Sequence, residues 1–392
     1  MSTKPPSFSS IVVAGCGSVG RAFLLLAADY LRSFPFVFPV DLEGDSMKGR
    51  SASKEYRVLT GDIEDGVFLA RLLDGVPPPL LFVNLCSGVD TVRLRQRLSG
   101  RQAAYIDVGA SALPPGAPSS FRDIMVYTNT AVPGPYPHLL CQGLNPGIVE
   151  LVARRLMRDF FDTSHPLEVV VFERDTLSAD LPDGAVPVGW SPGDLLEEMI
   201  LLPAFEIRHG RPLESTRNGS LPLRGTWNDE RIQARVVAHE DIWHLGLLER
   251  VWNARFIYSF ADTVMDLINL RPKEAGQRLV IPLEETPVRG LDTVIVTVRD
   301  LVSGRSQSRA WSVDHFDVWR QYGLNGVQYQ TATSLLLSLL FLQRGGLPEG
   351  EGTYSSATMP LDPGAWALFD SLLEELGVRW LPMKEEDLPV FG

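Results

Sequence analysis

The first part of the chain alternates short apolar runs with segments in which apolar residues recur at helical spacing. Buried strands are predicted at 11–14, 36–42, 56–59, 80–85, 103–108 and 139–144. Helices are predicted at 19–31, 67–73, 90–98 and 146–161. Strands without polar alternation, separated by helices, are typical of a parallel sheet covered on both faces. The pattern therefore predicts an α/β fold with a doubly wound parallel sheet over residues 1–147.

From residue 148 the pattern changes to strands joined by hairpins and long loops. Strands are predicted at 167–172, 234–238 and 255–260, a helix at 194–201, a loop over 208–227, and a hairpin of 293–298 with 305–313. This order predicts a second, α+β domain with a mixed or antiparallel sheet over residues 148–324, for substrate binding and dimerisation. Helices at 331–342 and 363–376, the latter after Asp362 as N-cap, belong to a segment 325–392 that we expect to pack back on the first domain.

Composition and charge narrow the function classes. The chain has 392 residues, 45% hydrophobic and 21% charged, which favours a globular protein of two domains. Its net charge is -12 and it has no Lys/Arg-rich run, which argues against nucleic acid and favours a cationic ligand. The start lacks the apolar core of a signal peptide, and no apolar run reaches the roughly 18–20 residues of a membrane span. We expect a cytoplasmic protein that does not bind membranes.

A glycine-rich segment joins the first predicted strand to the first predicted helix. It reads Gly15-x-Gly17-x-x-Gly20, in which the glycines permit a tight turn, the approach of a pyrophosphate, and close packing of helix on strand. The amides of Ser18 and Val19 then face the phosphates. Asp41 ends the second strand and is placed to bind the ribose 2′-hydroxyl, where a 2′-phosphate would be repelled. The segment predicts an NAD-binding Rossmann domain; a glycine-rich turn without a cofactor is the alternative.

Residues at the ends of the following strands are further candidates for cofactor binding. In a parallel sheet these positions face the ligand crevice. They are Asp62, Asn84, Leu85, Cys86 and Asp107. Each of them is also a residue that a simple turn would use.

The segment Gly143-Leu144-Asn145-Pro146-Gly147 follows the sixth predicted strand. Asparagine before proline suits a helix N-cap followed by proline at the first helical position. The same turn is placed to reach the nicotinamide, so Asn145 and Pro146 are candidates for cofactor binding.

Acidic and aromatic residues gather in the second half of the chain. They are Glu173, Asp175, Glu197, Glu198, Glu240 and Asp241, with Trp190, Trp227 and Trp243 near them in sequence. A cation over an indole face is attracted by about 0.5–2 kcal/mol, and a carboxylate adds orientation. This composition favours a small amine as substrate, and a solvated acidic surface is the alternative.

The segment from His239 to His244 is close to a zinc-binding HExxH motif. That motif requires its second histidine at the position of Trp243. We therefore expect no metal site.

Several of these segments, with others, occur in a recognisable order along nearly the whole chain. They are Gly15 to Gly20 with Arg21, Asn84-Leu85 with Asp90-Thr91, Tyr105-Ile106-Asp107, Gly143 to Gly147, Glu173-Arg174-Asp175-Thr176, Trp190-Ser191 followed by Glu198, Trp227, His239 and Thr333-Ser334. In this combination the chain resembles the bacterial homospermidine synthases, within the wider saccharopine dehydrogenase-like group.

The resemblance implies an NAD-dependent enzyme that lends a hydride to its cofactor and takes it back. One putrescine is oxidised to an imine, ammonia leaves, a second putrescine attacks, and the new imine is reduced to homospermidine. It implies that Trp227 holds a cationic intermediate over its ring and that Glu198 orients a terminal ammonium. Asn145 would lie near the nicotinamide, His239 is counted with the catalytic residues, and a homodimer is implied.

Two segments depart from the family's pattern. Gly109 to Leu113 stands where the family has an acidic residue and a tryptophan, which removes a carboxylate expected to recognise the diamine. Ser259 to Asp262 stands where the family has a His-Pro-Ser-Asn segment. The chain is also shorter than the family usually is, so a changed amine or a lost activity are alternatives.

Two other functions fit the same residues. A reductase of the saccharopine or carboxyspermidine dehydrogenase kind would condense an amine with a carbonyl compound and consume NADH or NADPH. It would need a basic pocket for a substrate carboxylate, for which Arg174, Arg208 and Arg255 are candidates. A non-catalytic protein that keeps NAD as a structural or sensing ligand is the third possibility.

Overall fold

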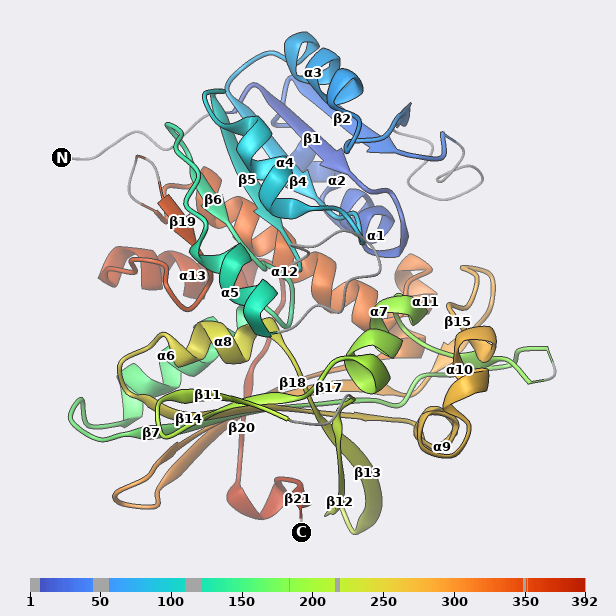
Figure 1. Ribbon diagram of the computed structural model, residues 1–392, viewed down its shortest axis with the longest axis vertical. Helices are drawn as coiled ribbons and strands as arrows, with labels where there is room; N and C mark the ends of the chain where they lie inside the picture. Colours follow the sequence, from blue (N-terminus) through green and yellow to red (C-terminus); the bar gives the residue numbers. More distant parts are fainter. Residues whose placement is uncertain are drawn as a thin grey trace. The chain divides into compact units, whose positions relative to one another are not determined.

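The chain forms two compact units (Figure 1). The computed structural model describes residues 8–44, 56–109, 121–182, 184–215, 219–347, 350 and 352–391. The first unit comprises Met1–Ile148 with Thr331–Val378, and the second comprises Val149–Gln330 with Arg379–Gly392. The segment 325–392 was expected with the first domain; its last part joins the second unit because two short strands there extend that unit's sheet.

The first unit is built on a parallel sheet of seven strands among the described residues. In spatial order they are β19 (Gly352–Tyr354), β6 (Pro137–Leu139), β5 (Ala103–Asp107), β4 (Leu80–Asn84), β1 (Ser10–Ala14), β2 (Phe36–Asp41) and β3 (Leu59–Thr60). Every residue of β1, β4 and β5 is buried, which explains why these strands lack polar alternation. The predicted doubly wound sheet is confirmed.

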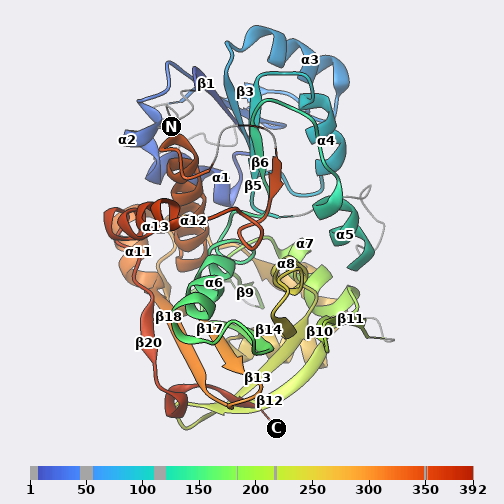
Figure 2. The same cartoon turned by 90° about the vertical axis from the view of Figure 1, so that its left-hand side faces the viewer.

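Helices cover both faces of this sheet. They are α1 (Ser18–Leu26), α2 (Ala28–Leu31), α3 (Gly66–Gly75), α4 (Thr91–Leu98), α5 (Phe121–Asn129), most of α12 (Gly326–Gln343) and α13 (Pro363–Glu375). Leu69 of α3 and Leu94 of α4 pack on Phe82 and other residues of one face. Helices α1 and α12 lie on the opposite face (Figure 2). Asp362 caps α13 as predicted, by accepting a hydrogen bond from the amide of Ala365 at 2.7 Å.

The sixth strand differs from its prediction. It ends at Leu139, whereas we expected a strand over 139–144, and the residues that follow it form turns. The edge strand β19 was not predicted either, because it has three half-buried residues beside a glycine-rich segment. Long-range pairing with β6 creates this strand, which local sequence does not favour.

The second unit contains a mixed sheet of ten strands in the described part of the chain. In spatial order they are β20 (Leu381–Met383), β18 (Ser306–Asp314), β17 (Leu291–Asp300), β7 (Leu167–Asp175), β14 (Val251–Phe260), β13 (Glu230–Val237), β12 (Leu221–Trp227) and β21 (Val390–Phe391), with β10 (Phe205–Arg208) and β11 (Arg211–Glu214) attached to β14. Strands β7 and β14 run parallel and the other pairs antiparallel. The α+β second domain and its β17–β18 hairpin are confirmed.

The predicted loop over 208–227 is wrong. Strands β11 and β12 occupy most of it, with residues 216–218 outside the described part of the chain. All four residues of β11 are exposed and β12 has no fully buried residue, so neither strand has the apolar run on which strand prediction depends.

Shorter elements complete the second unit. The helices are α6 (Ile148–Phe160), α7 (Pro192–Leu196), the π-helical turn η2 (Glu197–Leu201), α8 (Glu240–Gly246), α9 (Asp262–Leu270), α10 (Pro272–Arg278), α11 (His315–Tyr322) and the 3-10 turn η3 (Glu385–Asp387). Two small strand pairs are β8 (Ser178–Ala179) with β16 (Val288–Arg289), and β9 (Val186–Pro187) with β15 (Leu279–Val280).

The two faces of the ten-stranded sheet differ in chemistry. Successive side chains of a strand point to opposite faces. Phe172 of β7 belongs to an apolar core with Ile257 and Ile295 on one face. Glu173 and Asp175 therefore point to the other, which we call the acidic face.

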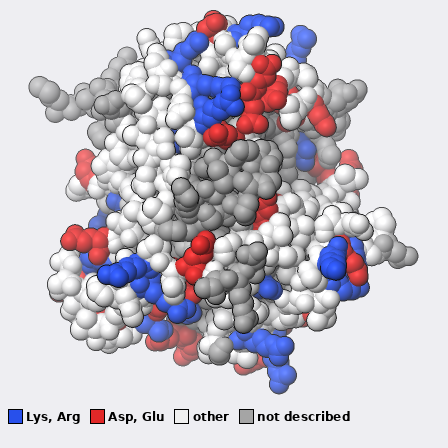
Figure 3. Space-filling view, viewed as in Figure 1, with Lys and Arg blue, Asp and Glu red and all other residues white. Residues whose placement is uncertain are grey.

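The charged side chains on the surface in Figure 3 do not form a patch of one sign. On the face of the molecule in Figure 3, Lys and Arg side chains lie among Asp and Glu side chains. No helix of the described residues is long and apolar enough to span a bilayer.

Candidate functional site

The glycine-rich segment of the first unit forms a turn that two of its glycines require. Gly15 has φ +90°, and a Cβ there would lie 2.7 Å from the backbone of Leu85. A Cβ at Gly20 would overlap the carbonyl oxygen of Gly15. These two glycines let β1, the turn and α1 pack together, as the motif predicts.

Gly17 lies in open space at the start of α1. It is exposed, and a Cβ there would have no heavy atom of the described chain within 4 Å. Gly17 is the N-cap of α1 and makes no side-chain hydrogen bond, so the amides of Ser18 and Val19 begin the helix without a side-chain cap. Helix N-termini of this kind bind phosphate groups, and the turn fits a dinucleotide.

Asp41 is held beside this turn. Its Oδ2 accepts a hydrogen bond from the Cys16 amide at 2.7 Å, and its Oδ1 accepts one from the Glu43 amide at 2.9 Å. Burial, then the charge of Asp41, raises the pKa of the Cys16 thiol to about 12, so Cys16 stays protonated. A fixed carboxylate at the end of β2 suits a ribose hydroxyl and opposes a 2′-phosphate.

Two other residues predicted to bind the cofactor, Asp62 and Asn84, make hydrogen bonds within the protein. Asp62 is exposed and accepts a hydrogen bond from the Glu64 amide, in the turn before α3. Asn84 is buried; its Nδ2 donates to the Tyr105 hydroxyl at 3.1 Å and its Oδ1 accepts from the Cys86 amide at 3.3 Å. Asn84 thereby holds the turn after β4, and Leu85 and Cys86 form the wall behind Gly15.

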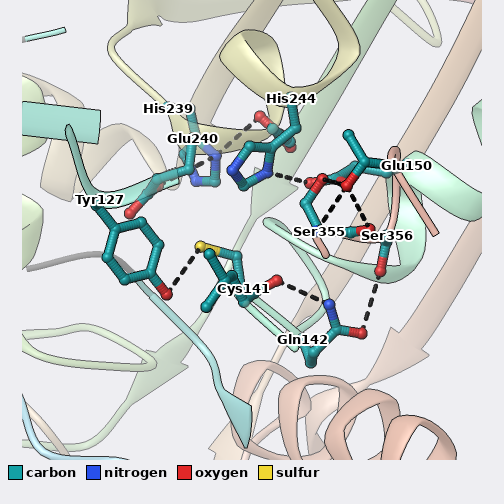
Figure 4. A network of polar contacts seen from close by, with 12 residues as sticks. Tyr127, Cys141, Gln142, Glu150, His239, Glu240, His244, Ser355 and Ser356 are labelled. Carbon is teal, nitrogen blue, oxygen red and sulfur yellow. Dashed lines mark hydrogen bonds and ion pairs between the residues drawn. The ribbon is translucent and has the colours of Figure 1, made fainter. Parts of the chain in front are cut away.

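Asp107 is the last residue of β5 and belongs to a buried network of hydrogen bonds. It accepts hydrogen bonds from the Tyr127 hydroxyl and, at 2.6 Å, from the Cys141 amide. Burial raises the pKa of this carboxyl to about 6. Figure 4 shows Tyr127 beside the Cys141 sulfur, and Gln142 accepting a hydrogen bond from Ser356 at 3.2 Å. The structure therefore gives Asp107 a role in holding β5, α5 and the turn at Cys141 together.

The turn after β6 corrects one interpretation. Helix α6 begins at Ile148, so Asn145 is not its N-cap and Pro146 is not its first residue. A bridge between Gly143 and Gly147 closes the turn, and the Ile148 amide donates to the Gly143 carbonyl at 3.0 Å. A Cβ at Gly147 would overlap the Gly143 carbonyl, which explains the glycine. Asn145 stays a predicted cofactor contact.

The acidic face of the second unit carries a cluster of buried acids. Strand register places Tyr258 of β14 next to Glu173, and Asp292 of β17 next to Asp175. These three carboxyls are at most 1% exposed, and the Tyr258 hydroxyl donates to Glu173 Oε1 at 3.1 Å. Burial, then Glu173 and Asp175, raises the pKa of Asp292 well above its ordinary value. Like charges this close disfavour full ionisation of the cluster.

Glu198 and His239 join this cluster from two further elements. Glu198 lies on η2, and its Oε2 is enclosed with no hydrogen-bond partner among the described residues. Burial raises its pKa well above the ordinary value; His239 opposes the rise, and Glu240, Asp194 and Glu173 add to it.

His239 is a buried cation. Its Nδ1 lies 2.9 Å from Asp241 Oδ1, and its ring stacks on Phe256 at 4.2 Å. Burial opposes its charge, but Asp241, Glu198 and Glu240 together raise its pKa to about 10.

The histidine inside α8 has a different partner. His244 Nδ1 lies 2.8 Å from Glu150 Oε1 of α6, and both residues are fully buried (Figure 4). In the described part of the chain, no three His, Cys, Asp or Glu side chains are placed to hold a metal ion.

Trp227 does not join the acidic cluster. Its ring packs edge-on against Phe172 at 5.6 Å, the Arg174 guanidinium lies 5.7 Å from its centroid, and its Nε1 donates to the Asp387 carbonyl. Phe172 and Arg174 point away from Glu173, so Trp227 lies on the apolar face. Trp227 therefore does not fit the role of cation-binding indole that we expected. The alternation of side chains along the strands determines the face on which it lies, and spacing in the sequence alone does not show this.

The arginines considered for a substrate carboxylate are also elsewhere. Arg174 pairs with Glu230 and Arg208 with Glu206, at 3.6 and 2.7 Å. Arg255 is opposite Val170 in the register, so it too points away from the acidic face.

The two segments that depart from the family's pattern have different outcomes. Residues 110–113 lie outside the described part of the chain, so their interpretation stays a prediction. Ser259 points to the apolar face and donates to the Gln233 carbonyl at 2.7 Å, and Asp262 begins α9.

Sequence reasoning missed Tyr258, Asp292 and His315. Tyr258 and Asp292 lie inside apolar strands, and His315 starts a short helix. A polar residue that interrupts an otherwise buried strand is the signal that would have found the first two.

The fold is similar to two solved structures. Homospermidine synthase from Legionella pneumophila, in complex with NAD, has a TM-score of 0.75 at 13% identity, covering 96% of this chain and 92% of that one. Saccharopine dehydrogenase (L-Glu forming) from Saccharomyces cerevisiae has a TM-score of 0.59 at 11% identity, covering 97% and 100%. No family model and no curated protein sequence matches the chain. The likeness establishes the fold: a parallel Rossmann-like sheet with a second domain of mixed sheet.

Proposed function

We propose that this chain is an NAD-dependent oxidoreductase of the homospermidine synthase type, which joins amines through an imine. The observation that carries the proposal is the acidic cluster. The groups that act on Glu198 are the carboxyls of Glu240, Asp194 and Glu173 and one opposing cation, His239. Glu173 is buried and the other three acids are half-buried. Gathering these acids out of full contact with water is unfavourable unless cations accompany them, and a substrate ammonium supplies such a charge.

The first unit supports NAD as the cofactor. The Gly15–Gly20 turn leaves space at Gly17, presents the start of α1, and carries Asp41 beside it. The structurally similar homospermidine synthase was determined in complex with NAD. NAD, when bound, accepts a hydride from an amine carbon and returns it to an imine.

The acidic cluster supplies the groups that such a reaction requires. An amine must lose a proton before it attacks an imine, and a carboxyl whose pKa is raised is a stronger proton acceptor than an ordinary one. Burial raises the pKa of Glu198, and its Oε2 is enclosed with no hydrogen-bond partner among the described residues, which supports Glu198 as this acceptor. Trp190 replaces Trp227 as the candidate indole, because it follows Gly189, which approaches Asp175, and its Nε1 is enclosed.

Product analysis tests the proposal. The purified chain is incubated with NAD and putrescine, and products are identified by mass spectrometry while absorbance at the NADH band is followed. We expect homospermidine, or the analogous product of another diamine, without net NADH. A Glu198→Gln variant serves as the negative control.

The other outcomes identify the alternatives. Net oxidation of added NADH or NADPH with an amine and a keto acid would indicate a reductase. Binding of NAD without any effect of amines on its fluorescence would indicate a non-catalytic protein. The homodimer and the cytoplasmic location stay predictions.

A further inference from the structure

His315 is a buried histidine with a hydrogen-bond partner at each ring nitrogen. It begins α11 and is fully buried. Its Nδ1 accepts a hydrogen bond from the Gly326 amide at 2.8 Å. Because a backbone amide can only donate, Nδ1 carries no proton, and the proton of the ring is on Nε2. The fold thus fixes a single tautomer of His315.

Asp175 receives the hydrogen bond from that Nε2 proton. The Nε2 atom lies 3.0 Å from Asp175 Oδ1, and the Leu177 amide donates to the same oxygen at 2.8 Å. Two donors thus hold the same carboxylate oxygen. Its other oxygen, Oδ2, is enclosed and has no hydrogen-bond partner among the described residues. One oxygen of Asp175 is therefore held by the protein, and the other has no hydrogen-bond donor among the described residues.

Gly189 and the start of α12 pack closely beside Oδ2. A Cβ at Gly189 would lie 3.1 Å from Oδ2 and 2.7 Å from a methyl carbon of Val327, so a larger residue would not fit here. The Asn325 side chain donates to the Gly189 carbonyl at 2.8 Å and accepts from the Gln328 amide at 2.9 Å. The first turn of α12 thus fixes both the tautomer of His315 and the glycine next to Asp175.

The ionisable groups around Asp175 favour a cationic donor. Glu173 lies on the same face of β7 as Asp175. Asp292 of β17 is opposite Asp175 in the register, and Tyr258 of β14 is opposite Glu173. Arg174, the nearest basic residue in sequence, points to the apolar face over Trp227. An ammonium group provides both the missing positive charge and three N–H donors.

We propose that His315 is a positioning residue of the amine site, which holds Asp175 so that its Oδ2 binds an ammonium group of the substrate. This inference rests on the proposed function, because it assumes an amine substrate. It adds a residue that acts through Asp175 and does not touch the substrate.

Two substitutions separate the two hydrogen bonds of His315. In His315→Gln the side-chain amide reaches the position of Nε2 and keeps a donor toward Asp175. In His315→Asn the shorter side chain reaches only the position of Nδ1, so it accepts from Gly326 and leaves Asp175 Oδ1 without its donor. Both variants remove the ring, so a merely structural role predicts similar effects for the two.

The test measures amine binding to the full chain loaded with NAD, by calorimetry with putrescine, cadaverine, 1,3-diaminopropane and spermidine. For the amine that binds wild type most tightly, we expect His315→Asn to weaken binding about tenfold or more, because a hydrogen bond to a charged group is lost. His315→Gln should stay within about threefold of wild type. NAD affinity and the melting temperature are measured for every variant as folding controls.

The outcomes distinguish the two proposals. If wild type binds none of the four amines, the proposed function fails and this inference fails with it. If wild type binds an amine and His315→Asn binds it equally well, only the positioning role is overturned. Nitrogen-15 NMR of wild type provides a test that needs no variant: the His315 ring should carry its proton on Nε2, and a proton on Nδ1 would overturn the inference.

Discussion

The two candidate sites of this protein are built by different means. The phosphate turn of the first unit is one contiguous segment in which backbone atoms act and glycines permit close approach. The acidic cluster of the second unit draws side chains from β7, β14, β17, η2 and α8, which only sheet register and helix packing bring together. A backbone site is visible as a motif, whereas a side-chain site depends on which face each residue occupies.

This difference also sets how each site responds to substitution. In the turn, a methyl group added to a glycine disrupts the fold where it would overlap other backbone atoms, and leaves the fold intact where it would meet none. In the cluster, removing one carboxyl relieves repulsion among the others, so the fold tolerates the change while binding and proton transfer do not. The predictions that follow use pairs of variants to test this contrast.

The largest effect is expected at Glu198. The change Glu198→Gln removes the proposed proton acceptor, and we expect turnover to fall by about 10²-fold or more. The control is Glu197→Gln, since Glu197 is the exposed neighbour on the same turn of helix. Steady-state kinetics with putrescine and NAD provide the measurement. Equal losses in the two variants would show that burial does not distinguish these acids.

Substitution of the glycines should separate folding from cofactor binding. Gly20→Ala places a methyl group on the Gly15 carbonyl, so we expect both a lower melting temperature and a loss of NAD binding. Gly17→Ala meets no atom of the described chain, so the melting temperature should not change while NAD affinity falls about tenfold. Calorimetry and thermal denaturation distinguish the two. Unchanged NAD affinity in Gly17→Ala would argue that no pyrophosphate lies there.

Much of the first unit was predictable from sequence because its signals are local. Apolar runs identify β1, β4 and β5, which are buried on both faces. The exceptions, β6 and β19, are short strands created by pairing at the sheet edge. In the second unit the strands β11 and β12 escaped prediction because neither has a buried apolar run.

The site was only partly predictable. Glu173, Asp175, Glu198 and His239 were identified from their sequence context, and the structure brings them together. Trp227 was misplaced because a spacing of 29 residues from Glu198 says nothing about the face of the sheet it occupies. His315 was missed because its role depends on the Gly326 amide and on Asp175, which lies 140 residues away in sequence.

The corrected position of Trp227 leads to a prediction on stability. Trp227→Ala removes the contact with Phe172 and the hydrogen bond to Asp387, so we expect a loss of about 2 kcal/mol in unfolding free energy, since the ring is only half-buried. The Michaelis constant for the amine should not change. Trp252→Ala, at a residue 46% exposed on β14, is the control for loss of an indole. A large rise in the Michaelis constant with normal stability would restore the catalytic role first expected for Trp227.

The last prediction concerns how the slope of stability against pH differs between wild type and a His239 variant in the alkaline range. The pKa of His239 is raised from about 6.5 to about 10, so its stabilising contribution is complete below pH 6.5 and is lost as the pH rises through 10. One such group changes the unfolding free energy by at most about 1.4 kcal/mol per pH unit. Melting temperatures of wild type should therefore fall more steeply between pH 7 and 10 than those of His239→Gln, whereas His209→Gln, at an exposed residue, should match wild type. Parallel curves for wild type and His239→Gln would mean that His239 is neutral in the folded protein. In that case the cluster would lose its one internal cation, and its remaining acids would have to be protonated or balanced by a bound amine.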